Sequence, residues 1–213
     1  PELSIEECVL VAQRAFRKGS FMMRDQYDEC EKNNPIIEQM VSTALTELRE
    51  YGPALSPPRG ERQHKVEIPI RFKDGEDGAI NALGYLDFYF PDFNCVYDLK
   101  TTAKAPSGFS LGHGIQAAFY QKAVERKFKR KPIVRFLYAL TRKKNPIVTL
   151  ELESEEADRY IQILKRSVIG MEKLLSAFDT KEEILSVLPY NPETFYWSDA
   201  RGIAAELYGE TAA

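Results

Sequence analysis

The sequence predicts an α/β or α+β fold in which a mixed β-sheet is flanked by helices. Residues 4–50 carry helical patterns, β-branched and aromatic runs dominate residues 65–101, and a helix, two strands and a long helix follow. The chain has 213 residues, of which 44% are hydrophobic and 29% charged, so it can bury a sizeable core. We expect one domain, with a helical region over 1–60, a sheet core over 61–153, and a C-terminal helix and tail over 154–213.

The first region is predicted to be helical. Ser4 and Glu7 have the spacing of a capping box. Apolar residues then recur at helical spacing at Ile37, Met40, Val41, Leu45 and Leu48. The segment Asn33-Asn34-Pro35 predicts a break between two helices, and the prolines and glycines of residues 52–60 end the helical region.

The sheet core begins with a strand predicted over residues 65–72 and a turn over 73–78. Two more strand-like runs, 83–90 and 95–101, are separated by Pro91-Asp92-Phe93-Asn94, which has turn chemistry. These two runs therefore predict a β-hairpin in which Phe90 pairs with Cys95.

The rest of the chain alternates between loops and regular elements. We expect a loop over residues 102–108, a helix over about 110–129, and strands over 132–140 and 147–153 joined by a turn at 142–146. A long amphipathic helix should follow from Ser154 to about Phe178, and the tail after Thr180 should be irregular.

Composition excludes several classes of protein. Cys8, Cys30 and Cys95 are far apart, which argues against a disulfide framework, a structural zinc site and an iron–sulfur cluster. There is no transmembrane run and no signal-peptide pattern, so we expect a cytoplasmic protein without a membrane partner.

The net charge of −3 does not by itself indicate a protein that binds nucleic acid. Basic residues nevertheless gather near the end of the predicted 110–129 helix. They are Lys122, Arg126, Lys127, Lys129, Arg130 and Lys131. Two interpretations stay open at this point: the cations complement the helix macrodipole at a solvated helix end, or they contact DNA phosphates.

The predicted hairpin brings two acids together. Counting outward from the Phe90–Cys95 pair places Asp87 opposite Asp98, with Lys100 on the same face. Two carboxylates about 5 Å apart repel by roughly 3 kcal/mol at an effective dielectric near 20, so a cation between them is expected.

The chemistry of these groups indicates which cation. Oxygen ligands suit Mg²⁺ or Mn²⁺, which Asp87, Asp98 and the main-chain carbonyl of Leu99 could hold together with waters. The Lys100 ammonium could orient a water or stabilise charge on a phosphate. These are the parts of a metal-dependent phosphodiesterase.

Three motifs carry a resemblance to a known family. Gly84-Tyr85-Leu86-Asp87 is followed, after ten residues, by Asp98-Leu99-Lys100-Thr101-Thr102. This order resembles the RecB-like form of the PD-(D/E)XK nuclease superfamily, and Gln116-Ala117-Ala118-Phe119-Tyr120 resembles its Q-x-x-x-Y helix motif. The nearest likeness is to the RecE-type exonucleases.

The resemblance implies a restriction-endonuclease-like core and a Mg²⁺- or Mn²⁺-dependent deoxyribonuclease. Asp87 and Asp98 would be metal ligands, Lys100 would be catalytic, and Gln116 and Tyr120 would line the site and contact the strand being cut. It further implies a 5′ to 3′ exonuclease that acts on double-stranded DNA ends and leaves 3′ single strands for recombination. By the same analogy, a single-strand-annealing protein as partner and a homo-oligomeric ring are expected in a bacterial or phage-infected cell.

One family feature is absent. RecB-like enzymes usually carry a histidine or an acid on an early helix, but no histidine precedes His64. Glu38, a residue upstream of Pro1, or Glu67 on the first strand could supply that ligand. Two other functions also stay open: a non-catalytic DNA-binding or assembly module of the same fold, and an endonuclease.

Overall fold

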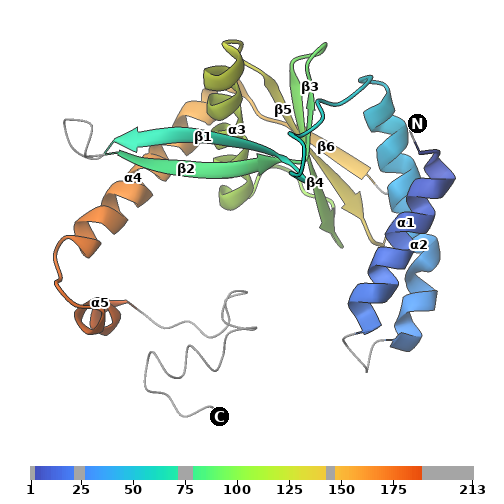
Figure 1. The fold of residues 1–213 in the computed structure, drawn as a ribbon, viewed down its shortest axis with the longest axis horizontal. Helices are drawn as coiled ribbons and strands as arrows, with labels where there is room; N and C mark the ends of the chain where they lie inside the picture. The colour runs from blue at the N-terminus through green and yellow to red at the C-terminus, as the bar shows by residue number, and fades with distance from the viewer. Residues whose placement is uncertain (1–2, 22–26, 72–78, 143–146, 189–213) are drawn as a thin grey trace.

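The computed structural model describes residues 3–21, 27–71, 79–142 and 147–188 of the chain (Figure 1). Its helices and strands follow one another as α1 (Ile5–Phe21), α2 (Tyr27–Arg49), β1 (His64–Arg71), β2 (Ala79–Leu86), β3 (Phe88–Phe90), β4 (Cys95–Thr102), α3 (Leu111–Phe128), β5 (Ile133–Leu140), β6 (Ile147–Glu151), α4 (Ser154–Leu175) and α5 (Lys181–Val187). None of the described helices is both long enough and apolar enough to span a membrane.

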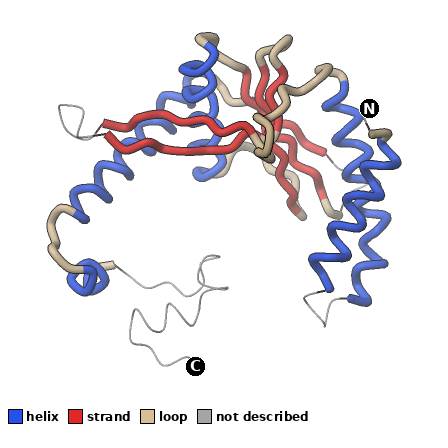
Figure 2. The backbone as a smooth tube through the Cα atoms, viewed as in Figure 1, coloured by secondary structure: helices blue, strands red, loops and turns tan. Residues whose placement is uncertain are grey.

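The strands form a four-stranded sheet and a separate two-stranded ribbon. The sheet has the order β3-β4-β5-β6, and it is mixed because β4 and β5 are parallel while both outer pairs are antiparallel. β1 and β2 form the antiparallel ribbon, which crosses in front of α3 in Figure 2. The predicted fold, a mixed sheet flanked by helices, is confirmed.

Helices cover both faces of the four-stranded sheet. Because side chains alternate along a strand, Val96 and Phe136 join a core cluster with Ala117 of α3, while Tyr97 and Leu137 face the other way. Tyr97 and Leu137 pack in a second cluster with residues of α2. β5 and the first half of β4 are buried on both faces, which explains the long apolar run of β5.

Two glycines let α3 approach its neighbours closely. A Cβ atom on Gly84 of β2 would lie 2.4 Å from Cε1 of Phe119, and one on Gly114 would lie 2.2 Å from Cζ of Tyr160 in α4. Both distances are too short for any larger side chain, because the obstructing atoms belong to packed rings. The first residue of the G-x-x-D motif is therefore a glycine so that α3 can lie against the ribbon.

The predicted helix break at Asn33-Asn34-Pro35 is wrong. α2 runs from Tyr27 to Arg49 with Pro35 inside it. A proline costs a helix interior about 3 kcal/mol because it lacks the N–H that would bond to the previous turn. Burial of Ala44 and Leu48 against the sheet offsets that cost, and Gln13 of α1 donates a hydrogen bond to the carbonyl of Asn34.

The predicted strand over 83–90 is two strands in the structure. The chain leaves the ribbon after Leu86, bends at Asp87, and enters the four-stranded sheet at Phe88. Phe90 pairs with Cys95 as predicted. The predicted turn at 73–78 lies outside the described residues, as do residues 143–146 of the predicted 142–146 turn.

The C-terminal end of the described chain also differs from the prediction. α4 ends at Leu175, and α5 follows where an irregular tail was expected. Thr180 and Glu183 form a capping box at the start of α5. That T-x-x-E spacing is visible in the sequence and could have predicted the helix.

Candidate active site

Asp87 lies at the bend between the ribbon and the four-stranded sheet. β5 pairs with Leu99 on one side of β4, but β3 pairs with β4 only as far as Phe88 and Tyr97, so no strand reaches Leu99 on the β3 side. The Asp87 carboxylate takes that place, because its Oδ2 accepts a hydrogen bond of 2.9 Å from the Leu99 N–H. A strand residue projects its N–H and C=O to the same side, so the Leu99 carbonyl also points toward Asp87.

Asp98 is buried on β4, with only 2% of its surface exposed. Its Oδ2 lies 2.5 Å from Lys100 Nζ, and its Oδ1 accepts a hydrogen bond of 3.2 Å from Gln116 Nε2. Apart from the Lys100 ammonium, Oδ2 has no polar partner within the described part of the chain. A carboxylate oxygen with unused lone pairs in a buried position is suited to a further cation.

The charge of Asp87 acts on Asp98. Burial raises the pKa of Asp98 above its ordinary value, the Lys100 ammonium opposes that rise, and the charge of Asp87 adds to it. Asp87 and Asp98 therefore lie close enough to repel, which is the situation that calls for a cation between them.

Gln116 and Tyr120 lie on one face of α3 and connect three elements. Gln116 Nε2 donates a second hydrogen bond, of 2.7 Å, to the Tyr120 hydroxyl, which in turn donates to the carbonyl of Tyr85 at 2.8 Å. Burial raises the pKa of Tyr120 and the charge of Asp98 raises it further, so the phenol stays protonated as a donor. The chain of bonds holds the Asp98 carboxylate in place between β2, α3 and β4.

Lys100 borders a small hollow. Its Nζ lies 5.1 Å from the centre of the Phe136 ring, a cation–π contact, and its side chain is 23% exposed. The hollow has a volume of about 250 Å³ and is lined by Lys100, Thr101, Thr102, Pro106, Gly108, Ser110, His113 and Tyr138. His113 Nδ1 lies 2.8 Å from the Tyr138 hydroxyl, and burial together with Lys100 lowers the pKa of His113.

Sequence reasoning missed Gln63. Its Nε2 donates a hydrogen bond of 2.5 Å to Asp87 Oδ1, so this amide and the Leu99 N–H together orient the Asp87 carboxylate. Gln63 lies just before β1, 24 residues from Asp87. No motif marks it, and only the pairing of β1 with β2 brings it to the site.

Glu38 and Glu67 do not join the acid pair. Glu38 is exposed on α2, which packs on the Tyr97 face of the sheet, and the Asp98 side chain points to the opposite face. Glu67 is exposed on β1, with Oε2 3.8 Å from Lys65 Nζ. Among the described residues, no group of three or more histidine, cysteine, aspartate or glutamate side chains could hold a metal ion.

The remaining donors still fit a hard divalent cation. They are the carboxylates of Asp87 and Asp98 and the main-chain carbonyl of Leu99. Mg²⁺ is usually held by one or two carboxylates and keeps several of its waters, so a third acidic side chain is not needed. The unused lone pairs of Asp98 Oδ2 support the same assignment.

The raised pKa of Asp98 predicts a pH-dependent difference in stability. The stability gained from a protonated Asp98 is present below the ordinary pKa of about 4 and is lost as the pH rises through the raised value. Asp98→Asn is always neutral and does not undergo this loss. Without divalent metal, the melting temperature of the wild type should fall relative to that of Asp98→Asn as the pH rises above the ordinary aspartate pKa of about 4. A difference that does not vary with pH would contradict the burial of a charged Asp98.

Comparison with known proteins places this geometry in a family. Two solved structures resemble the chain: a protein from Eubacterium rectale provisionally called an exonuclease (15% identity, TM-score 0.48, covering 93% of this chain and 75% of that chain) and the protein SSO0001 (14% identity, TM-score 0.36, covering 71% of each). No curated protein sequence matches the chain. The sequence profile of the PD-(D/E)XK nuclease superfamily matches residues 13–189. The chain therefore belongs to the PD-(D/E)XK nuclease superfamily.

Proposed function

We propose that the protein is a deoxyribonuclease that uses Mg²⁺ or Mn²⁺ to hydrolyse phosphodiester bonds. The observation that carries this proposal is the buried Asp98 carboxylate, held between Lys100 and Gln116 and repelled by Asp87. The repulsion between the two acids favours binding of a further cation beside Lys100, and the pair lies on the motifs that resemble nuclease active sites.

Each residue has a distinct role in this proposal. Asp87, Asp98 and the Leu99 carbonyl would hold the metal ion, which when bound supplies a water of lowered pKa and stabilises charge on the phosphate. Lys100 would orient the attacking water and stabilise the developing negative charge. Gln116 and Tyr120 act through Asp98, so we assign them as positioning residues.

We further propose that the enzyme is an exonuclease acting on double-stranded DNA ends. It would digest the 5′ strand and leave a 3′ single strand for recombination, with a single-strand-annealing protein as partner and a homo-oligomeric ring as its assembly. The support for this finer assignment is the likeness of the D-L-K-T-T and Q-x-x-x-Y motifs to those of RecE-type exonucleases.

Digestion of labelled DNA tests the proposal. On a linear duplex with Mg²⁺ or Mn²⁺, a 5′ label should be released early, whereas a 3′-labelled strand should persist and a closed circular duplex should stay intact. Early release of the 3′ label would reverse the polarity. Cleavage of the circle would indicate an endonuclease, and no cleavage of any substrate with either metal would indicate a non-catalytic DNA-binding module.

A further inference from the structure

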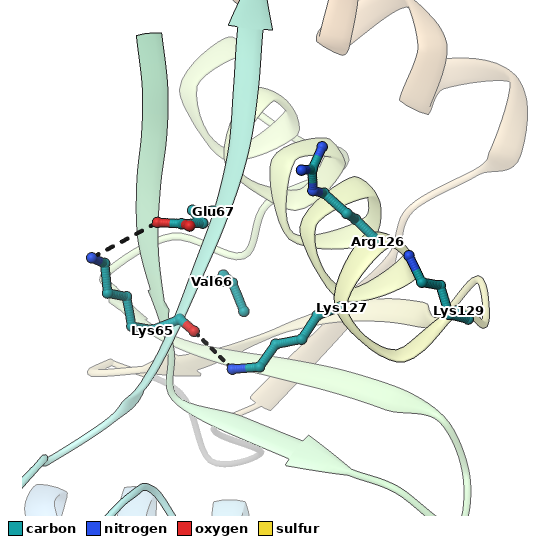
Figure 3. A pocket seen from close by; sticks show the side chains of 6 residues that line it. All are labelled: Lys65, Val66, Glu67, Arg126, Lys127 and Lys129. Carbon is teal, nitrogen blue, oxygen red and sulfur yellow. Dashed lines mark hydrogen bonds and ion pairs between the residues drawn. The ribbon is translucent and has the colours of Figure 1, made fainter. Parts of the chain in front are cut away.

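A basic hollow lies between β1 and the C-terminal end of α3 (Figure 3). It has a volume of about 730 Å³ and is lined by Lys65, Val66, Glu67, Arg126, Lys127 and Lys129, and we call it the β1–α3 groove. Lys127 reaches across it from α3, because its Nζ donates a hydrogen bond of 3.1 Å to the carbonyl of Lys65.

The charge of the groove is not neutralised. Four of its residues are cationic and one, Glu67, is anionic; the Glu67 carboxylate lies 3.8 Å from Lys65 Nζ. The side chains of Arg126 and Lys129 make no hydrogen bond or ion pair with any described residue. The whole chain carries a net charge of −3, so this excess of positive charge is local. Unpaired cations gathered in a groove of an acidic protein indicate a polyanionic ligand.

Other members of the same sequence cluster have protein partners. Lys122 Nζ lies 3.8 Å from Glu125 and 3.6 Å from Asp158 of α4. Lys131 Nζ donates a hydrogen bond of 3.3 Å to Ser154 at the start of α4. Two cations of the cluster thus bond toward α4, and three others line the groove.

The groove is connected to the candidate active site. A neighbouring hollow of about 390 Å³ is lined by Glu61, Arg62, Gln63, Lys65 and Tyr85. Gln63 donates a hydrogen bond to Asp87, and Lys65 lines both hollows. A continuous, mostly polar surface therefore leads from the Asp87 carboxylate to the β1–α3 groove.

The groove lies a short way along α3 from the candidate active site. Lys127 follows Tyr120 by seven residues on α3, which corresponds to about 10 Å along the helix axis. The cations at the end of α3 therefore lie within a few turns of helix from the candidate active site.

We propose that the β1–α3 groove binds backbone phosphates of the DNA substrate on the side of the candidate active site where Gln63 contacts Asp87. The proposal rests on the proposed deoxyribonuclease function. Because lysine and arginine would contact phosphates rather than base edges, binding in the groove is independent of base sequence.

The salt dependence of DNA binding tests the groove. The test variant is Arg126→Gln with Lys129→Gln, because neither side chain has a partner in the described structure and the fold should not depend on them. The control is Lys122→Gln with Lys131→Gln, which removes the same charge from the α4 side. Both pairs are made in the Asp98→Asn protein, and duplex affinity is measured with chelator at several salt concentrations.

Loss of two phosphate contacts should reduce the slope of log affinity against log salt by about 1.8. If affinities converge at 1 M salt, the test variant should bind about 60-fold more weakly at 0.1 M and about 3- to 4-fold more weakly at 0.5 M. The control pair should keep the slope of its parent. An unchanged slope in the test variant, or an equal loss in both pairs, would overturn the groove assignment.

The experiments can refute the groove assignment and the proposed nuclease activity independently of each other. A wild-type protein that cleaves DNA while the test variant binds normally would refute the groove alone. A wild-type protein that never cleaves DNA, combined with a slope loss confined to the test variant, would refute the nuclease activity and leave the groove as a DNA-binding site.

Discussion

Asp98→Asn is expected to lower the rate of linear-duplex cleavage by about 1,000-fold or more, the scale seen when an essential charged group is removed from an active site. Asparagine keeps the shape of the side chain and can still accept the hydrogen bond from Gln116, but it lacks the negative charge that would hold a cation. Lys100→Ala should lower the rate by roughly 10²- to 10⁴-fold, the usual contribution of a group that assists proton transfer.

DNA binding separates a catalytic defect from a folding defect in these variants. Both should bind duplex DNA with nearly the affinity of the wild type, since Asp98 is buried and the groove cations are unchanged. Asp92→Asn and Lys104→Ala make the same chemical changes at exposed positions nearby and should keep full activity. Substantial cleavage by Asp98→Asn or by Lys100→Ala would show that the reaction takes place elsewhere.

Mg²⁺ or Mn²⁺ should raise the melting temperature of the wild-type protein. A ligand that binds only the folded state at 100 times its dissociation constant stabilises by about 2.7 kcal/mol. For a chain of about 200 residues this corresponds to a shift of roughly 5–10 °C. The physical reason is that a divalent cation removes the repulsion between Asp87 and Asp98, and Asp98→Asn should therefore lose most of the response.

Thermal scans with matched ionic strength check this prediction. NaCl at the same ionic strength controls for general screening, and Asp92→Asn should respond to both metals as the wild type does. If the wild-type melting curve is the same with and without either metal, Asp87 and Asp98 do not form the metal site.

The hairpin is the part of the fold that local reasoning predicted best. Turn residues and alternation set the Phe90–Cys95 pairing, which the structure confirms. Extending that register is what predicted Asp87 opposite Asp98, although the observed ladder ends at Phe88 and Tyr97. The prediction failed at Asp87 itself, where one long strand was expected. The bend exists because residues on its two sides pair with different partners, β1 and β4, and no local pattern reports which partner a strand will have.

In the N-terminal helices, by contrast, long-range packing overrode the local sequence pattern. The predicted break at Pro35 followed a sound local rule, and packing of α2 against the sheet overrode it. The same packing decides the position of Glu38. A helix pattern identifies which residues share a face, but the side of the sheet that the helix covers depends on long-range contacts.

The sequence by itself determined the mixed α/β fold, the pairing register of the hairpin and the set of chemical groups on its acidic face, because these depend on side-chain alternation and turn residues within a short stretch of chain. Only the tertiary structure decided that Gln63 orients Asp87 and that Glu38 and Glu67 lie apart from the acid pair. It also decided that two of the six clustered cations bond toward α4 while three others line a groove. Those outcomes depend on contacts between segments far apart in the chain, and such contacts leave no periodic signal in the sequence.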